Sequence, residues 1–248
     1  MNFDKYKSRI RRNGENVGDA YNNNTIALIE STFHASPTFR VIGVSSTEMP
    51  LVTEMDARVV EVERMGSLRE ILFRPTDESL NVGAKVIFDG ETWLIFDKFG
   101  KNKALAEACN RMLKWRDRDG SLIEVDCIAS AMDLGSKAKQ SRNEIEWNKY
   151  DVRLPLGQLF VFAELTDETK KIRLNDRFVF GAKVYEVVGI DDTTTVSRSG
   201  FGVIQLVVKV TTIKEEDDFV NGIALNESYE EEEGAVEPTE PNEEGMVW

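Results

Sequence analysis

Residues 76–95 read TDESLNVGAKVIFDGETWLI, and residues 166–187 read TDETKKIRLNDRFVFGAKVYEV. The two stretches align from the shared acidic Thr-Asp-Glu start, and a two-residue gap then keeps the spacing of the apolar positions. Val86 and Trp93 fall on Phe178 and Tyr185. Each copy has an acidic turn, an alternating apolar strand, a glycine-containing turn and a second strand with an aromatic residue near its start, which is the pattern of a β-hairpin. The chain therefore contains the same hairpin twice, about ninety residues apart.

The strands expected around these hairpins place most of residues 38–213 in β-structure. Short alternating or β-branched runs predict strands at 38–44, 57–63, 68–73, 122–128, 159–164, 177–180, 184–189 and 203–212, and the first repeat hairpin is expected at about 85–97. Residues 2–12 and 24–33 predict two helices ahead of the strands, and a short helix is a further expectation for residues 101–114. We expect a mainly β protein with two related small barrel-like or sandwich-like units. Closure of both repeats into one larger barrel is the alternative.

Composition divides the chain into five segments. We expect an N-terminal helical arm with an entry strand in residues 1–45, a first β unit in 46–132 and a polar linker or projecting loop in 133–151. A second β unit in 152–213 and a disordered acidic tail in 214–248 complete the division. The tail holds thirteen of the 44 acids and one of the 31 bases, so it carries −12 of the net charge of −13 and leaves −1 for residues 1–213. A nearly neutral body does not favour a broad DNA-binding surface.

No apolar run approaches the roughly 20 residues of a membrane helix, and residues 1–12 lack the apolar core of a secretory leader. We therefore expect a protein made in the cytoplasm, with no contact to a membrane. Cys109 and Cys127 are then expected to be reduced and buried, and a disulfide between them is the less favoured alternative.

The residues that resemble catalytic or binding groups have simpler structural explanations. His34 is the single histidine, which excludes a multi-histidine metal site and disfavours a His-based triad. The Asp191-Asp192 pair is typical of a turn rather than of a cation site, and Gly200-Phe201-Gly202 is typical of a turn between strands. The acidic run Glu230 to Glu233 is typical of a solvated tail.

The aromatic and basic candidates also have simpler structural explanations. Trp93 and Tyr185 are expected to pack in the core rather than to form a stacking platform for single-stranded nucleic acid. The basic cluster of Arg9, Arg11 and Arg12 is expected to face solvent or an acidic partner, with DNA as the less favoured contact. We assign no catalytic, cofactor-binding or metal-binding residue, and we expect no enzyme activity and no cofactor.

Several stretches resemble virion structural proteins of tailed phages and prophages of Gram-positive bacteria, in particular head-closure and head–tail connector proteins. These stretches are FDKYKSRI (3–10), FHASPTFRVIGV (33–44), ILFRPTDESLNVGAKV (71–86), TWLIFD (92–97), ACNRMLKWRDRDG (108–120), DVRLPLGQLFVF (151–162), RFVFGAKVYEVVGIDD (177–192) and FGVIQLVVKVTTIKEEDDF (201–219). The hairpin of such proteins follows the pattern G-x-x-V-x-x-x-G-x-x-Y/W. Gly83, Val86, Gly90 and Trp93 match it in the first copy.

In the second copy, Asn175 stands where the first glycine is expected, while Phe178 and Tyr185 keep the apolar positions. Two copies in one chain depart from the shortest head-closure proteins. The resemblance implies a non-enzymatic virion protein that assembles as a homo-oligomeric ring, with a portal or adaptor on one side and tail proteins on the other. DNA is then expected to pass through the lumen without sequence-specific binding. A tail component such as a tail terminator, collar or baseplate-proximal protein is the first alternative, and a nucleic-acid-binding β-barrel module is the second.

Overall fold

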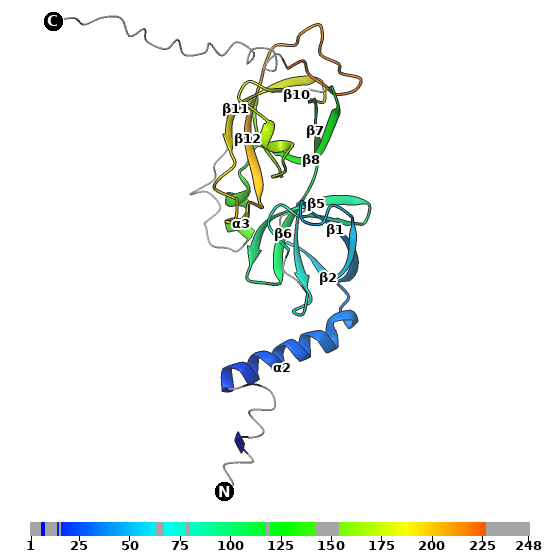
Figure 1. Ribbon diagram of the computed structural model, residues 1–248, viewed down its shortest axis with the longest axis vertical. Helices are drawn as coiled ribbons and strands as arrows, with labels where there is room; N and C mark the ends of the chain where they lie inside the picture. The colour runs from blue at the N-terminus through cyan, green and yellow to red at the C-terminus, as the bar shows by residue number, and fades with distance from the viewer. Residues whose placement is uncertain are drawn as a thin grey trace, which may run out of the picture.

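The computed structural model describes residues 6–7, 14, 16–62, 67–77, 80–117, 120–141 and 154–226. Two six-stranded antiparallel units follow one another along the chain, and helix α2 (Val17–Thr32) stands off the first unit (Figure 1). The first unit contains β1 (Phe39–Ser45), β2 (Thr53–Glu61), β3 (Leu68–Phe73), β4 (Lys85–Phe88), β5 (Glu91–Phe99) and β6 (Lys103–Ala108). The second contains β7 (Arg111–Arg116), β8 (Leu122–Ser130), β9 (Gln158–Glu164), β10 (Arg177–Phe180), β11 (Lys183–Asp191) and β12 (Val203–Val210).

The two units have the same strand order. The first is a closed barrel with the order β1-β2-β3-β6-β5-β4, and the second sheet, followed from β7, has the order β7-β8-β9-β12-β11-β10. The edge strands β7 and β10 approach each other, and the rings of Trp115 and Phe178 meet edge-to-face with centroids 5.9 Å apart. The mainly β fold with two related barrel-like units is confirmed, and the single larger barrel is not what the chain forms.

The hairpin repeat lies at the same place in both units. In the first copy β4 pairs with β5 so that Val86 lies opposite Trp93, and in the second β10 pairs with β11 so that Phe178 lies opposite Tyr185. Both second strands also contain an irregularity at the same distance from the turn, after Ile95 and after Val187. The predicted repeat is thus part of a duplication that extends over all six strands.

An apolar seam joins the two units. Leu68, Leu94, Phe96 and Leu105 on the outer face of the first barrel pack against Ile128, Leu134, Phe160, Phe162 and Val203 of the second unit. Polar contacts border this seam: Glu164 of β9 accepts hydrogen bonds from the backbone N–H and hydroxyl of Thr47, and Lys137 pairs with Glu107. Burial raises the pKa of Glu107, and the Lys137 ammonium opposes that shift. The two units are therefore packed against each other rather than strung on a linker.

The division between the units differs from the expected one. β7 and β8, expected in the first unit, belong to the second sheet, because β8 pairs with β9. β1 closes the first barrel by pairing with β4, so the entry strand belongs to that unit and not to the N-terminal arm. The boundary falls at residues 109–110 instead of 133–151.

The helix expected within residues 101–114 does not form, and this segment makes β6 and β7 instead. Ala104 and Ala106 face the barrel core, while Leu105 faces the seam. Both faces of β6 are covered, so the strand lacks the polar alternation of a half-exposed strand. This explains why its composition, rich in Ala, Leu and Glu, resembles that of a helix.

The helices and the tail also differ in extent from the expectations. α2 begins seven residues before the expected helix at 24–33, and a 3₁₀ turn, η1 (Phe33–Ala35), follows it. Residues 134–141 of the expected linker form α3 (Leu134–Ser141), and η2 (Thr169–Lys171) precedes the second hairpin. Of the helix expected at 2–12, only Tyr6 and Lys7 are described, and both are helical.

The beginning of the expected tail is folded. Residues 214–226 pack on the second unit: the carboxylate of Asp217 is fully buried and pairs with Arg177, and Ile223 and Ala224 are buried beside it. Residues 227–248 lie outside the described part of the chain. None of the helices in that described part has the length and apolar character needed to cross a bilayer.

Candidate functional site

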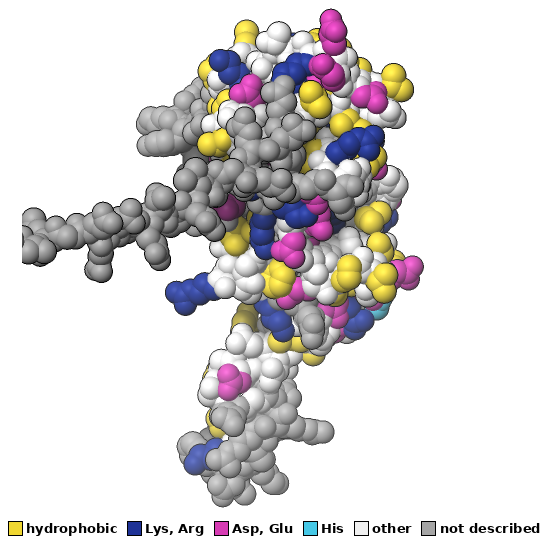
Figure 2. Space-filling view, turned by 45° about the horizontal axis from the view of Figure 1, so that its top comes forward, with side chains coloured by type: hydrophobic (Ala, Val, Ile, Leu, Met, Phe, Trp, Pro, Cys, Tyr) yellow, Lys and Arg dark blue, Asp and Glu magenta, His cyan; other side chains and the backbone are white. Residues whose placement is uncertain are grey.

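Helix α2 is the most prominent feature outside the two barrels. Its N-terminus is capped by Asn16, whose side chain accepts a hydrogen bond from the backbone N–H of Asp19. No described residue of α2 is buried, and Figure 2 shows the helix as a projection from a body on which acidic and basic side chains are mingled. A helix of 16 residues that buries nothing gains little stability from packing. Its attachment at one end is therefore what holds it in place.

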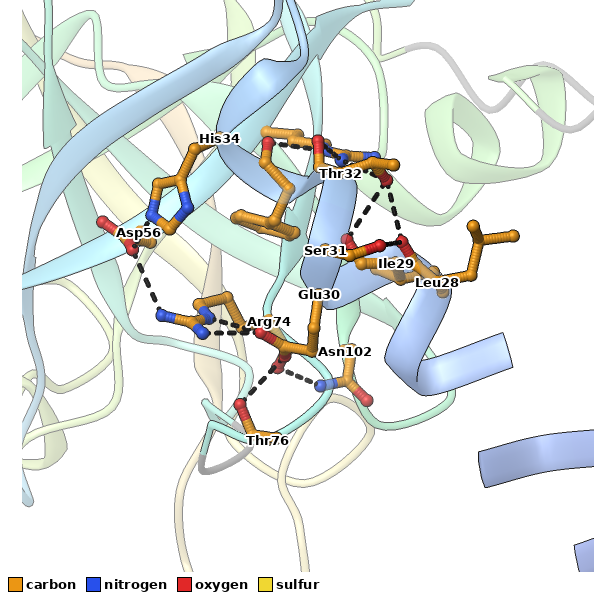
Figure 3. Close-up of polar contacts among 12 residues, drawn as sticks. Leu28, Ile29, Glu30, Ser31, Thr32, His34, Asp56, Arg74, Thr76 and Asn102 are labelled. Carbon is orange, nitrogen blue, oxygen red and sulfur yellow. Dashed lines mark hydrogen bonds and ion pairs between the residues drawn. The ribbon is translucent and has the colours of Figure 1, made fainter. Parts of the chain in front are cut away.

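Glu30 and Arg74 form the main attachment at the foot of the helix (Figure 3). The Nε and Nη2 groups of Arg74 donate to Oε2 of Glu30 at 2.9 and 2.6 Å, and the Thr76 hydroxyl donates to Oε1 at 2.9 Å. The Asn102 amide fixes the loop below, because it donates to the Arg74 carbonyl oxygen at 2.6 Å. The hydrogen bonds from Arg74, assisted by those from Thr76, lower the pKa of Glu30 although partial burial works against them.

Arg58 of β2 closes the C-terminal end of the helix. Its guanidinium donates to the carbonyl oxygens of Thr32 and Phe33, at 2.6 and 3.1 Å, where α2 passes into η1. The same guanidinium lies 4.8 Å from the centre of the Phe33 ring, which is fully buried. The Arg58 guanidinium thus caps the C-terminal end of α2 and also covers the buried Phe33 ring that follows the helix.

His34 completes this arrangement. Its Nε2 lies 2.8 Å from Oδ2 of Asp56, the same oxygen that Nη1 of Arg74 approaches at 3.5 Å. The imidazole also meets the Phe33 and Phe39 rings edge-on, with centroids 6.2 and 4.8 Å away. His34 therefore has a structural role, because its contact with Asp56 joins the turn after α2 to strand β2.

A groove of about 720 Å³ lies beside the foot of α2, on the first barrel. It runs between the β1–β2 connection and the β3–β4 connection. Its lining residues are Ser46, Glu48, Met49, Thr53, Glu54, Met55, Asp56, Arg74, Asp77, Leu80 and Asn81. Four carboxylates and one guanidinium line it, so its net charge is negative. We call this feature the acidic groove.

The remaining candidates are the two cysteines and Asp191. Cys127 is buried, Cys109 is partly buried and both are free thiols; burial raises the pKa of Cys109 to about 12 and that of Cys127 further. Asp191 caps a turn by accepting the backbone N–H groups of Thr193 and Thr194, and the side chain of Thr194, together with these backbone hydrogen bonds, lowers the pKa of Asp191. No group of three His, Cys, Asp or Glu residues suited to a metal ion occurs within the described ranges.

Trp93 packs in the core as expected. Its side chain is 3% exposed and stacks on Phe88 with ring centroids 5.0 Å apart, and Tyr185 is partly buried against Phe180. Gly200 ends a turn in which its N–H donates to the carbonyl oxygen of Ser197, and the carbonyl oxygen of Gly202 beyond it accepts a hydrogen bond from the N–H of Leu165. Arg9, Arg11 and Arg12, and the run Glu230 to Glu233, lie outside the described residues.

Sequence reasoning did not select Glu30, Arg74, Arg58 or Asp56. These residues come from α2, β2 and the loop after β3, up to 44 positions apart, and each alone resembles an ordinary surface charge. The one indication in the sequence was the end of α2, which has no basic residue in its last turn to cap its carbonyl groups.

The second unit is similar to a known domain. Residues 111–209 match the family described as the YomX C-terminal domain. The match starts at the first residue of β7 and ends within β12, so it covers the second unit and leaves α2 and the first barrel outside. It indicates a phage-related protein. Neither the curated proteins nor the solved structures include a match to the chain.

Proposed function

We propose that the chain is a non-enzymatic virion protein of the head–tail junction, a head-closure protein or neck adaptor that assembles as a ring between portal and tail. The observation that carries the proposal is the anchored projecting helix on a body of two related β units, of which the second matches a phage-related domain. A ring subunit needs a body that keeps its shape and an element that reaches its neighbour. The two packed β units supply the rigid body, and α2 supplies the element that reaches a neighbour.

The exposed apolar face of α2 supports a role in contacts between subunits. Val17, Tyr21 and Leu28 are 70%, 72% and 64% exposed, and at 100° per residue they fall within about 40° of one another around the helix. A helix of this length extends about 24 Å from its foot. Contacts of this kind are heterologous, because an arm on one subunit meets a different surface on the next, and such contacts form a ring when the rotation between subunits closes.

The polar cluster at the foot of α2 fits a structural role better than a catalytic one. Its charged groups satisfy one another: Glu30 pairs with Arg74, and His34 pairs with Asp56. Groups paired in this way hold the helix and are not presented to a substrate. A purified protein that turned over a substrate at a reasonable rate would contradict this part of the proposal.

The proposed partners are a portal or adaptor on one side of the ring and tail proteins on the other. The body of the chain carries −1 over residues 1–213 and the tail carries −12. A ring with this charge repels the DNA backbone wherever the tails face the lumen, so DNA would pass without sequence-specific binding.

The test is electron microscopy of lysates from a phage with an early stop codon in this gene, compared with a synonymous codon change at the same position. Empty or DNA-leaking heads beside free, complete tails are the expected result, and a plasmid copy of the gene should restore joined particles. Finished heads without assembled tails would move the protein into the tail. Infectious particles in normal number would contradict a structural role in the virion.

A further inference from the structure

We infer that the acidic groove binds the basic N-terminal segment, residues 3–12, of a second copy of the chain. This contact joins subunits, so it rests on the proposed self-assembly and not on a position in neck or tail. Its two sides are a described surface beside the foot of α2 and a segment that precedes α2 in the sequence.

Charge is the first observation that matches groove and segment. The groove presents Glu48, Glu54 and Asp77, whereas Asp56 is paired with His34 and the single cation Arg74 is engaged by Glu30. Within the described ranges, no Lys or Arg lies at ion-pair distance from Glu48, Glu54 or Asp77. The segment supplies the opposite charge in a dense run: Lys5, Lys7, Arg9, Arg11 and Arg12 against Asp4. Opposite potentials of this kind steer association and set its register.

Apolar side chains match in the same way. Met49, Met55 and Leu80 line the groove and pack against the core of the first barrel. The segment carries Phe3, Tyr6 and Ile10 at intervals of three and four residues, which is the sequence spacing of an amphipathic helix. Methionine-lined surfaces adapt readily to bulky apolar partners. A peptide that is apolar on one side and basic around it therefore suits this groove.

The geometry of α2 makes a second copy the occupant. Glu30 at the foot and Asn16 at the N-terminal end are fourteen residues apart, which is about 21 Å along a helix. Arg12 precedes Asn16 by four residues, and four residues span at most about 14 Å even when fully extended. The backbone of Arg11 and Arg12 therefore cannot return to the foot of α2 in its own chain. A neighbouring groove placed near the far end of α2 can receive all five cations.

A peptide-binding measurement tests the contact. A fluorescent peptide of residues 1–14 is titrated with the full-length chain, and fluorescence anisotropy is recorded at low and at high salt. We expect binding that weakens with salt and that falls by about tenfold or more when Glu48→Lys and Glu54→Lys are introduced together. Glu215→Lys with Glu216→Lys is the matched control, because both residues are exposed, lie on the second unit and change the net charge equally. Absence of binding to the wild-type chain, or equal loss in both variants, would overturn the inference.

A mixing experiment tests whether the occupant is a second copy. One chain carries Arg11→Glu and Arg12→Glu, the other carries Glu48→Lys and Glu54→Lys, and each has a photo-crosslinking phenylalanine analogue in place of Ile10. Only one of the two is isotopically labelled. Each alone should crosslink weakly to residues 46–56, and the mixture should regain crosslinks that join a labelled to an unlabelled chain. Crosslinks confined to single chains would exclude the second copy, whereas the particle phenotype of the stop codon is independent of this result.

Discussion

Gly83 and Asn175 hold equivalent positions ahead of the two hairpins and have the same unusual backbone conformation. Their φ angles are +96° and +72°, and each donates its backbone N–H to the second strand of its hairpin, to the carbonyl oxygens of Ile95 and Val187 at 2.8 and 2.9 Å. Asparagine tolerates the left-handed region better than other residues with a side chain. The difference between the two positions is a neighbour: a Cβ on Gly83 would collide with the carbonyl oxygen of Gly202 across the seam.

This difference predicts that a glycine-to-asparagine substitution lowers the free energy of unfolding more at Gly83 than at Gly90. Gly83→Asn should destabilise the protein by about 2–4 kcal/mol, because the new side chain must displace the backbone at Gly202. Gly90→Asn is the control, since Gly90 also has a positive φ, +80°, but no atom lies within 4 Å of the place that its Cβ would take. Gly90→Asn should lower the free energy of unfolding by less than about 1 kcal/mol. Urea denaturation measures both, and equal losses would show that backbone conformation, not the seam, restricts Gly83.

The buried pair of Arg177 and Asp217 predicts a large effect of a single substitution. The two side chains are joined by hydrogen bonds of 2.8 and 3.0 Å, and their exposed fractions are 7% and 0%. Asp217→Asn should lower the free energy of unfolding by about 3–5 kcal/mol, because it leaves a buried guanidinium without its counter-charge. Glu216→Gln, one residue away and exposed, should change it by less than about 0.5 kcal/mol. Arg177→Met combined with Asp217→Leu should recover part of the loss, and a double variant weaker than Asp217→Asn would contradict this explanation.

The same pair predicts how stability depends on acid. Burial opposes the shift, but hydrogen bonds from the backbone of Lys214 and Leu225 and from Arg177 hold the pKa of Asp217 below its ordinary value of 3.8. A carboxylate with a lowered folded-state pKa stabilises the fold above 3.8 and loses that contribution as the pH falls through the folded-state value. The wild-type chain should therefore lose stability more steeply below about pH 4 than Asp217→Asn. Denaturation curves between about pH 2 and 7, collected for both proteins, measure the difference, and parallel curves would rule out Asp217 as the source.

The contact between Glu30 and Arg74 predicts that its loss loosens helix α2 without lowering the stability of the two β units. Glu30→Gln weakens the attachment of α2 but removes nothing from either barrel core. Hydrogen exchange should accelerate at the amides of residues 26–32, while the urea midpoint of the barrels stays nearly unchanged. Glu54→Gln, which lies in the acidic groove away from this contact, should leave exchange in α2 as it is. Unchanged exchange in Glu30→Gln would mean that Arg58 and Phe33 suffice to hold the helix.

The exposed face of α2 predicts loss of assembly without loss of folding. Replacement of Val17, Tyr21 and Leu28 by serine should change the free energy of unfolding by less than about 1 kcal/mol, because all three side chains are already in solvent. In complementation of the stop-codon phage, the triple variant should fail to restore joined particles. Val60→Ser with Leu122→Ser, exposed apolar positions on the two units, should restore them. Full rescue by the triple variant would remove α2 from the proposed contact.

The elements that could be predicted from the sequence are those formed by residues close to one another in the chain. The hairpins β4–β5 and β10–β11 each lie within about twenty residues, so alternation and turn residues are enough to specify them. Asn175 in the place of glycine did not obscure the repeat, because asparagine satisfies the same backbone requirement. The helix expected at 101–114 was wrong because β6 is covered on both faces by elements distant in sequence.

The contacts at the foot of α2 and the acidic groove could not be predicted from the sequence. Arg74 meets Glu30 across 44 residues, and Asp217 meets Arg177 across 40. Each of these acids resembles a solvated charge when it is considered alone. Asp217 in particular lay inside a segment whose composition predicted a tail, and burial against Arg177 is what gives that segment a fixed structure.

By itself, the amino-acid sequence determined the mainly β class, the repeated hairpin and the concentration of negative charge after residue 213, because these depend on composition and on spacing between near neighbours. Only the tertiary structure decided that the duplication spans six strands, that the boundary falls at residues 109–110 and that α2 is pinned at its foot beside an acidic groove. Those features depend on which distant strands pair and on which charges are brought together, and the free energy of such contacts is set by burial, which no local pattern records.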